Sequence, residues 1–227
     1  MVLPSKREIE CFNKLKGWRL HFAWLRLTDG DHEAVLRIAI DGTVSIFRKK
    51  FFAGSYVDEP IVCSTRLLLM SGGLSRKRCV SSFELLAKRV LDSQGIQSEK
   101  PGVVFRDLLS LKSMTPWSIM DISQVSFPLV FRMGREEDGL NRDERNSNLK
   151  EYPVLCDRHG RVWTPITLAD EADIDALCRD ILLVCYAPIE QTREVAPKSH
   201  LGRMVHMTQS FRFVMERAFL PEEEVVI

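Results

Sequence analysis

LRIAIDGTVSIF, residues 36–47, is the strongest local pattern in this chain of 227 residues. Apolar residues occupy alternate positions on both sides of the central Asp41-Gly42 pair. Alternation is typical of a half-buried strand, and Asp-Gly accepts the positive φ angles of a two-residue type I′ turn. The pattern therefore predicts a β-hairpin with one apolar face and one face that carries cations.

Residues 18–28 show the same alternation closer to the N-terminus. They predict a strand that joins the hairpin in a three-stranded antiparallel meander. Helices are expected to pack against this meander. Ser81 and Glu84 form a capping box at the start of one predicted helix, which reaches Ser93, and residues 103–111 have the apolar spacing of another.

The remaining elements are predicted from shorter patterns. Residues 61–70 fit a strand and a helix equally well. The sequence predicts an α+β fold, in which an N-terminal antiparallel β-meander packed with helices is followed by a C-terminal hairpin plus helices. The further expected elements are helices over 4–16, 170–180 and 199–219, extended structure over 118–133, a second hairpin over 152–166 and a buried strand over 181–186.

The length and the composition, 45% apolar and 28% charged, are those of a folded protein of one or two domains. Residues 134–150 hold five acids, four bases and no aromatic residue, which predicts a mobile charged loop. This loop separates a basic α+β portion, residues 1–133, from an acidic α/β portion, residues 151–227, with a C-terminal amphipathic helix. The two portions form separate domains or one continuous domain.

Charge is distributed unevenly along the chain, although the formal net charge is +1. Residues 1–115 hold 19 Lys and Arg against 12 Asp and Glu, and residues 116–227 hold 13 against 19. The basic excess is concentrated between residues 42 and 83, and residues 222–224 form a short acidic run. Such asymmetry predicts an anionic partner for the basic part of the chain.

Two basic runs are the candidate binding segments. Residues 47–52, FRKKFF, interleave cations with rings, which suits single-stranded nucleic acid and the interface of an acidic membrane. Residues 71–78, SGGLSRKR, combine glycines with three cations, which suits a phosphate group. The predicted polyanion-binding residues are Arg48, Lys49, Lys50, Arg76, Lys77 and Arg78, and the predicted stacking or interfacial residues are Phe47, Phe51 and Phe52.

The sequence contains none of the common catalytic or nucleotide-binding motifs, so no catalytic residue and no cofactor is predicted. Cys156 and His159 have the spacing of half a zinc site, but a second pair of ligands with matching spacing is missing. The same residues fit a turn closed by Gly160, and this interpretation is preferred. Six scattered cysteines are typical of a reducing compartment, so we expect a cytoplasmic or nuclear protein.

These features favour a non-enzymatic binding or self-assembling protein. Its basic surface would face a polyanion, either nucleic acid or an acidic membrane, and opposite charges on one chain predict a homo-oligomer with head-to-tail contacts. Two alternatives stay open. One is an adaptor or regulatory module that binds a protein partner through the C-terminal helix or the 134–150 loop. The other is an enzyme with a dispersed Cys/His site. Only polyanion binding would weaken steeply with salt.

Overall fold

The computed structural model describes residues 9–30, 32–75, 78–139, 149–168, 174–175, 178–191 and 197–220. Within these ranges the chain forms five α-helices and two four-stranded sheets. The predicted α+β class is confirmed. In the part of the chain that the structure describes, no helix combines the length and the apolar composition needed to cross a bilayer.

Sheet A has the strand order β1-β4-β5-β6. Its first strand pairs in parallel with β4, and the other pairs are antiparallel. The last two strands form the second hairpin that the sequence predicts. The strands of sheet A are β1 (Cys11–Asn13), β4 (Leu129–Met133), β5 (Pro153–Cys156) and β6 (Val162–Trp163).

Sheet B has the order β3-β7-β2-β8 and is antiparallel throughout. The predicted strand over 18–28 is confirmed as β2, and the predicted buried strand over 181–186 is confirmed as β7. The strands of sheet B are β2 (Trp18–Leu27), β3 (Trp117–Asp121), β7 (Asp180–Pro188) and β8 (Phe211–Phe219).

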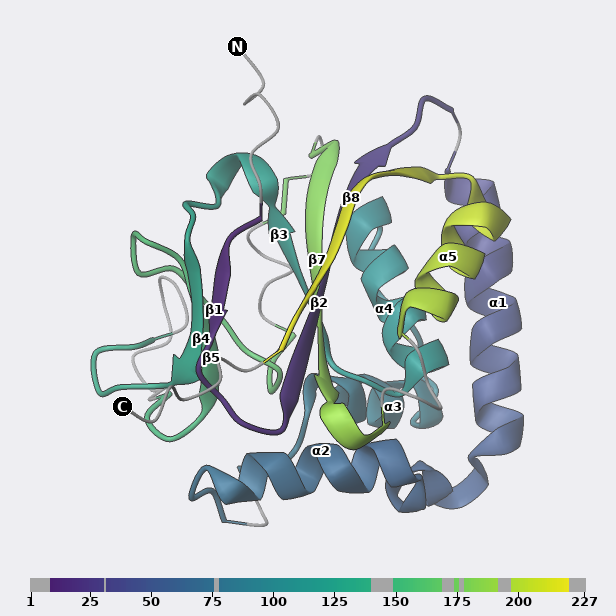
Figure 1. Cartoon of the computed structure of the whole chain (residues 1–227). Helices are drawn as coiled ribbons and strands as arrows, with labels where there is room; N and C mark the ends of the chain where they lie inside the picture. The colour runs from purple at the N-terminus through teal and green to yellow at the C-terminus, as the bar shows by residue number, and fades with distance from the viewer. Residues whose placement is uncertain are drawn as a thin grey trace.

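The helices occupy one face and one end of sheet B. Figure 1 shows α1, α4 and α5 over the face that points away from sheet A, with α2 and α3 at the lower end of the molecule. The α-helices are α1 (Glu33–Lys50), α2 (Pro60–Ser71), α3 (Ser82–Leu91), α4 (Pro101–Ser113) and α5 (Pro197–Thr208), and the short 3₁₀ segments are η1 (Phe52–Asp58), η3 (Ile122–Gln124) and η5 (Ile189–Gln191).

Strand β2 supplies both of the large cores because its side chains alternate between its two faces. Phe22 and its neighbours on one face pack with Phe131 and Tyr186 between the two sheets. Leu25 on the other face packs with Phe105 of α4 beneath the helices. A third cluster joins α1, η1, α2 and α3. Both sheets combine strands from residues 9–133 with strands from residues 153–219.

The hairpin predicted over residues 36–47 is wrong, and with it the N-terminal meander, because these residues lie in helix α1. Leu36, Val44 and Phe47 have helical spacing and are buried against the core. Ile38 and Ile46, which complete the apparent alternation, lie on the outer face and are 74% and 66% exposed. Apolar residues on two faces of one helix therefore imitate the period of a strand.

Three predicted helices also need correction. The final helix ends at Thr208, and residues 211–219 form β8 because they pair with β2. Cys11–Asn13, within the helix predicted over 4–16, is strand β1, and residues 1–8 lie outside the described residues. Of the helix predicted over 170–180, residues 174–175 and 178–179 are not helical and Asp180 begins β7; the other positions are not described.

The remaining local predictions agree with the structure where it describes them. The capping box is formed: the Ser81 hydroxyl accepts a hydrogen bond from the Glu84 backbone N–H, and the Glu84 carboxylate accepts one from the Ser81 N–H. Residues 61–70, for which the sequence fits a strand and a helix equally well, lie in helix α2, and residues 103–111 lie in α4. Residues 140–148 of the predicted mobile loop and residues 222–224 of the acidic run lie outside the described residues.

Candidate functional site: a basic and apolar groove between two helices

A groove runs between α1 and α5, which lie next to each other at the outer side of the helix layer (Figure 1). It consists of two adjoining cavities of about 340 and 470 Å³. The cavities meet at Ile46 of α1, Lys112 of α4 and Met204 and Met207 of α5, which line both of them. We call this feature the α1–α5 groove.

One end of the groove is apolar. Val35, Ile38, Gly42 and Ile46 follow each other at intervals of three or four residues, so they form one stripe along α1. Met207 faces this stripe from α5 and is 62% exposed. Large apolar side chains that gather on an exposed surface mark a contact with another molecule more often than scattered ones do.

The other end of the groove is basic. Lys50, Lys112, His200 and Arg203 line it, and no Asp or Glu occurs among the described residues that line either cavity. Lys112 comes from the last turn of α4 and is half-buried, and its burial lowers the pKa of the ammonium group. A desolvated cation with no carboxylate beside it is a favourable place for a bound anion.

His200 responds to the same cations. Burial, followed by the charges of Arg203 and Lys112, lowers the pKa of its imidazole below the usual value. His200 is therefore mostly neutral at pH 7 and adds a further positive charge to the groove when the pH falls. A bound anion would offset the repulsion and would raise this pKa.

The first predicted basic run lies at the C-terminal turn of α1, next to the groove. Lys50 lines the groove, forms an ion pair of 3.1 Å with Glu59 and lies 4.5 Å from the centre of the Phe51 ring. The Nε of Arg48 donates to the Val90 carbonyl oxygen at 2.9 Å. Lys49 is exposed. All three also face the negative end of the α1 dipole, which is a structural role.

The second predicted basic run lies elsewhere. Arg78 follows the C-terminal end of α2, and its Nε donates to the Tyr152 hydroxyl at 2.8 Å. Lys50 is held at the opposite end of α2 by its ion pair with Glu59, so the length of this helix, about 18 Å, separates the two runs. Arg76 and Lys77 lie outside the described residues.

The predicted stacking residues are divided between core and surface. Phe47 and Phe51 were predicted to meet a partner, but both are buried and pack with Tyr56 and Phe83, so neither ring is exposed for stacking in this structure. Their burial follows from the helical course of residues 33–50, which turns Phe47 inward. Phe52 is 84% exposed, and its interfacial role stays a prediction.

Three residues that complete the groove are not predicted from the sequence. Lys112, His200 and Arg203 stand alone in the sequence and belong to no charged run. The predicted hairpin divides the residues of the outer apolar stripe of α1 between its two faces, with Ile38 on the apolar face and Val35 and Ile46 on the face that carries cations.

The cysteines and the predicted turn have structural explanations. The Asp157 carboxylate accepts hydrogen bonds from the backbone N–H groups of His159 and Arg161, and Gly160 has a φ of +81°, which confirms the turn. Burial raises the pKa of the Cys156 thiol to about 11. Among the described residues no three His, Cys, Asp or Glu side chains gather as metal ligands would.

Comparisons with known proteins add little to this description. No protein-family model and no curated protein matches the sequence. One solved structure with partial similarity is an N-terminal fragment of the phenylalanyl-tRNA synthetase β-subunit from Pyrococcus horikoshii, at 9% identity and a TM-score of 0.39. The match covers 96% of this chain and 55% of that fragment, so the chain spans about half its length.

Proposed function

We propose that this chain is a non-enzymatic binding protein that attaches to an acidic membrane surface through the α1–α5 groove. The observation that carries the proposal is that Lys112, which has no ion-pair partner among the described residues, shares one groove with exposed Ile46 and Met207, and that no described acidic residue lines this groove. Acidic headgroups attract the cations, and apolar side chains enter the boundary between headgroups and acyl chains.

The distribution of rings favours a membrane over nucleic acid. Single-stranded nucleic acid binds to exposed aromatic side chains on which bases stack. Two of the three predicted rings, Phe47 and Phe51, are buried. The exposed apolar side chains of the groove are aliphatic residues and methionine, which insert between lipids but offer no flat surface to a base.

Three of the cysteines have properties unlike those of a catalytic thiol. A catalytic thiol needs a lowered pKa and a partly exposed, electropositive position. Burial instead raises the pKa of Cys79, and it raises the pKa of both Cys178 and Cys185 to about 12. These three thiols therefore resist ionisation.

Vesicle flotation tests the proposal directly. The chain should bind vesicles that contain phosphatidylserine, bind vesicles of phosphatidylcholine alone much less, and dissociate as salt is added. Lys112→Gln and Arg203→Gln should each weaken binding about fivefold, because one basic residue near an acidic surface contributes about 1 kcal/mol.

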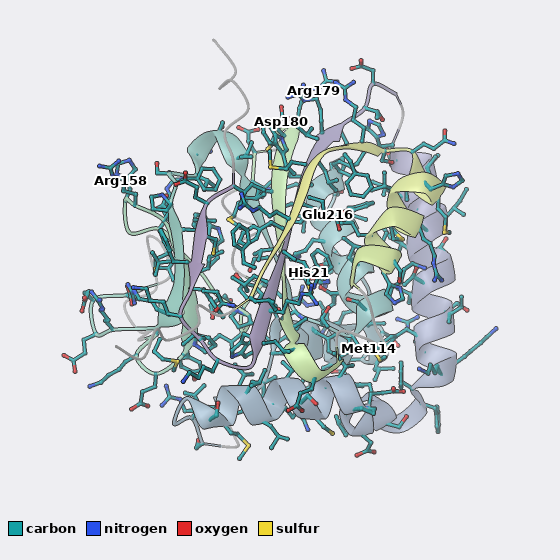
Figure 2. All side chains as sticks on the ribbon, in the orientation of Figure 1. His21, Met114, Arg158, Arg179, Asp180 and Glu216 are labelled. Atoms are coloured by element: carbon teal, nitrogen blue, oxygen red, sulfur yellow. The ribbon has the colours of Figure 1, made fainter. Side chains whose placement is uncertain are left out.

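Charge-matched variants serve as the controls. Lys14 lies in the β1–β2 connection, and Figure 2 places Arg158 on the side of the molecule opposite the groove. Lys14→Gln and Arg158→Gln, made separately, each remove the same charge as one groove variant and should bind vesicles as the wild type does. Equal binding by the groove variants, or preferred binding to single-stranded nucleic acid in the same assay, would refute the membrane proposal.

A further inference from the structure

The two ends of the α1–α5 groove differ in charge and in apolar character. The end near the start of α5 holds Lys50, His200 and Arg203. The end near the last turn of α5 holds Val35, Ile38 and Gly42, while Ile46, Lys112 and Met207 line both ends. A ligand that follows the groove from the first end to the second therefore meets cations first and apolar side chains afterwards.

Residues 222–227 of this chain show the complementary order. Their sequence is EEEVVI, in which three carboxylates precede three apolar residues. The other terminal stretch, residues 1–8, contains Lys6 and Arg7 and would be repelled by the basic end. Charge and apolar character thus select residues 222–227, which we call the acidic segment, as a fitting occupant of the groove.

The length of the acidic segment also matches the length of the groove. The lining of the groove extends from Lys50 to Val35 along α1, which is about 22 Å at the rise of an α-helix. Six residues in extended conformation span about 20 Å. The acidic segment can therefore place its carboxylates at Lys112 and Arg203 while its apolar residues reach Ile38.

The arrangement of the chain favours a groove on another copy. Strand β8 leaves the end of α5 and terminates beside β1 and β2, away from α1 (Figure 1). One residue separates the last described residue, Leu220, from Glu222, so Glu222 lies within about 7 Å of Leu220. This link is too short to carry the first carboxylate around sheet B to the basic end of the same copy.

We infer that the α1–α5 groove of one copy binds the acidic segment of a second copy, with Glu222–Glu224 at the basic end and Val225–Ile227 at the apolar end. The contact joins two different surfaces, so it is heterologous and each added copy leaves one groove and one segment open. The inference concerns contact between copies and does not depend on the membrane proposal. Where both hold, lipid and segment compete for one groove.

Mixing of two full-length variants tests this contact. The segment variant carries Glu222→Lys, Glu223→Lys and Glu224→Lys and keeps its groove. The groove variant carries Lys112→Glu and Arg203→Glu and keeps its acidic segment. Sedimentation velocity, measured without lipid at low salt, should show chains of copies for the wild type and monomers for each variant alone. An equimolar mixture should again form chains of copies, in which the two variants alternate, because the groove of each variant is opposite in charge to the segment of the other.

Several controls distinguish loss of this contact from unfolding and from unspecific effects of charge. The Lys14→Glu with Arg158→Glu variant should associate as the wild type does, and circular dichroism should show that the groove variant is folded. Combining both sets of reversals in one chain should restore association, because the charges again oppose each other. A monomeric wild type, an associating segment variant, or a mixture that stays monomeric would each overturn the inference, whatever the vesicles show.

Discussion

Asp138 stabilises the segment that follows β4 through hydrogen bonds to its carboxylate. Two guanidinium nitrogens of Arg132 donate to its carboxylate at 2.6 and 3.0 Å, and the Arg135 backbone N–H donates at 2.6 Å. The hydrogen bond from Arg132 leads the causes that hold the pKa of Asp138 below its usual value. Its contribution to stability is therefore present above the unfolded pKa of about 3.9 and is lost as the pH falls through the lower, folded value.

Asp138→Asn should lower the free energy of unfolding at pH 7 by about 1–3 kcal/mol, because it removes a bidentate, charge-assisted pair. Urea titrations at pH 7 and below pH ~4 measure this difference, which should shrink in acid. Glu137→Gln, at an exposed neighbouring carboxylate, should change little. A constant difference across this pH range would exclude the ionised pair as its cause.

His200 gives the groove a second residue-level property, which is a pH response. Because burial, Arg203 and Lys112 hold the pKa of its imidazole below the ordinary value, His200 is mostly neutral at pH 7 and gains its charge as the pH falls further. Vesicle binding should therefore strengthen on acidification, by up to about fivefold for one added charge.

Flotation at several pH values measures this response. His200→Gln should remove most of the increase, because the variant adds no charge to the groove. His206→Gln is the matched control on the same helix, since His206 is exposed and does not line the groove. If His200→Gln keeps the full increase, another group controls the pH dependence.

Among the elements, α1 differs most from the expectation drawn from the sequence, and Gly42 reports on that difference. In a hairpin this residue would need a positive φ, but in the structure it lies inside the helix, and an added Cβ would meet no atom within 4 Å. Gly42→Ala should therefore raise the free energy of unfolding by about 0.5–1 kcal/mol, because alanine favours the helix.

Chemical denaturation checks this prediction, with Gly160→Ala as the contrasting variant. Gly160 has a φ of +81° in the β5–β6 turn, so the same substitution there should destabilise the chain. Loss of stability in Gly42→Ala comparable to that in Gly160→Ala would contradict the helical assignment of α1.

The elements that the sequence predicts correctly depend on neighbouring residues. Ser81 and Glu84 satisfy each other's backbone groups across one turn, so the start of α3 is visible locally. Strand β8 is different. Helical spacing continues from Leu201 past Thr208, yet Phe211–Phe219 is a strand because it pairs with β2, about 190 residues earlier in the chain. Pairing at such separation overrides local preference.

The groove was predictable in part for the same reason. The run FRKKFF draws attention to Lys50, which lines the groove, because three consecutive cations are a local signal. Lys112 and Arg203 come from α4 and α5 and meet Lys50 only through the packing of three helices. An isolated cation carries no sequence signal for such convergence.

At the scale of the whole molecule, the basic and acidic parts of the chain are interleaved. Strand β2 lies between β7 and β8, both of which follow residue 150, and β3 pairs with β7 alone. Among the described residues of the stretch 1–139, no strand therefore pairs with another inside sheet B. The charge asymmetry of the sequence does not correspond to two separate sheets.

This interleaving predicts how the chain behaves when divided. A fragment of residues 1–139 should fail to unfold cooperatively, because Leu20, Phe22 and Leu25 of β2 are fully buried in the intact chain and would lose the strands on both sides. An isolated strand cannot satisfy its backbone groups or cover its apolar faces. Thermal denaturation followed by circular dichroism measures the transition. Adding residues 149–227 should restore it, since those residues supply β7 and β8. A sharp transition in the 1–139 fragment alone would mean that the basic portion has an independent core and that pairing across the chain is not required for folding.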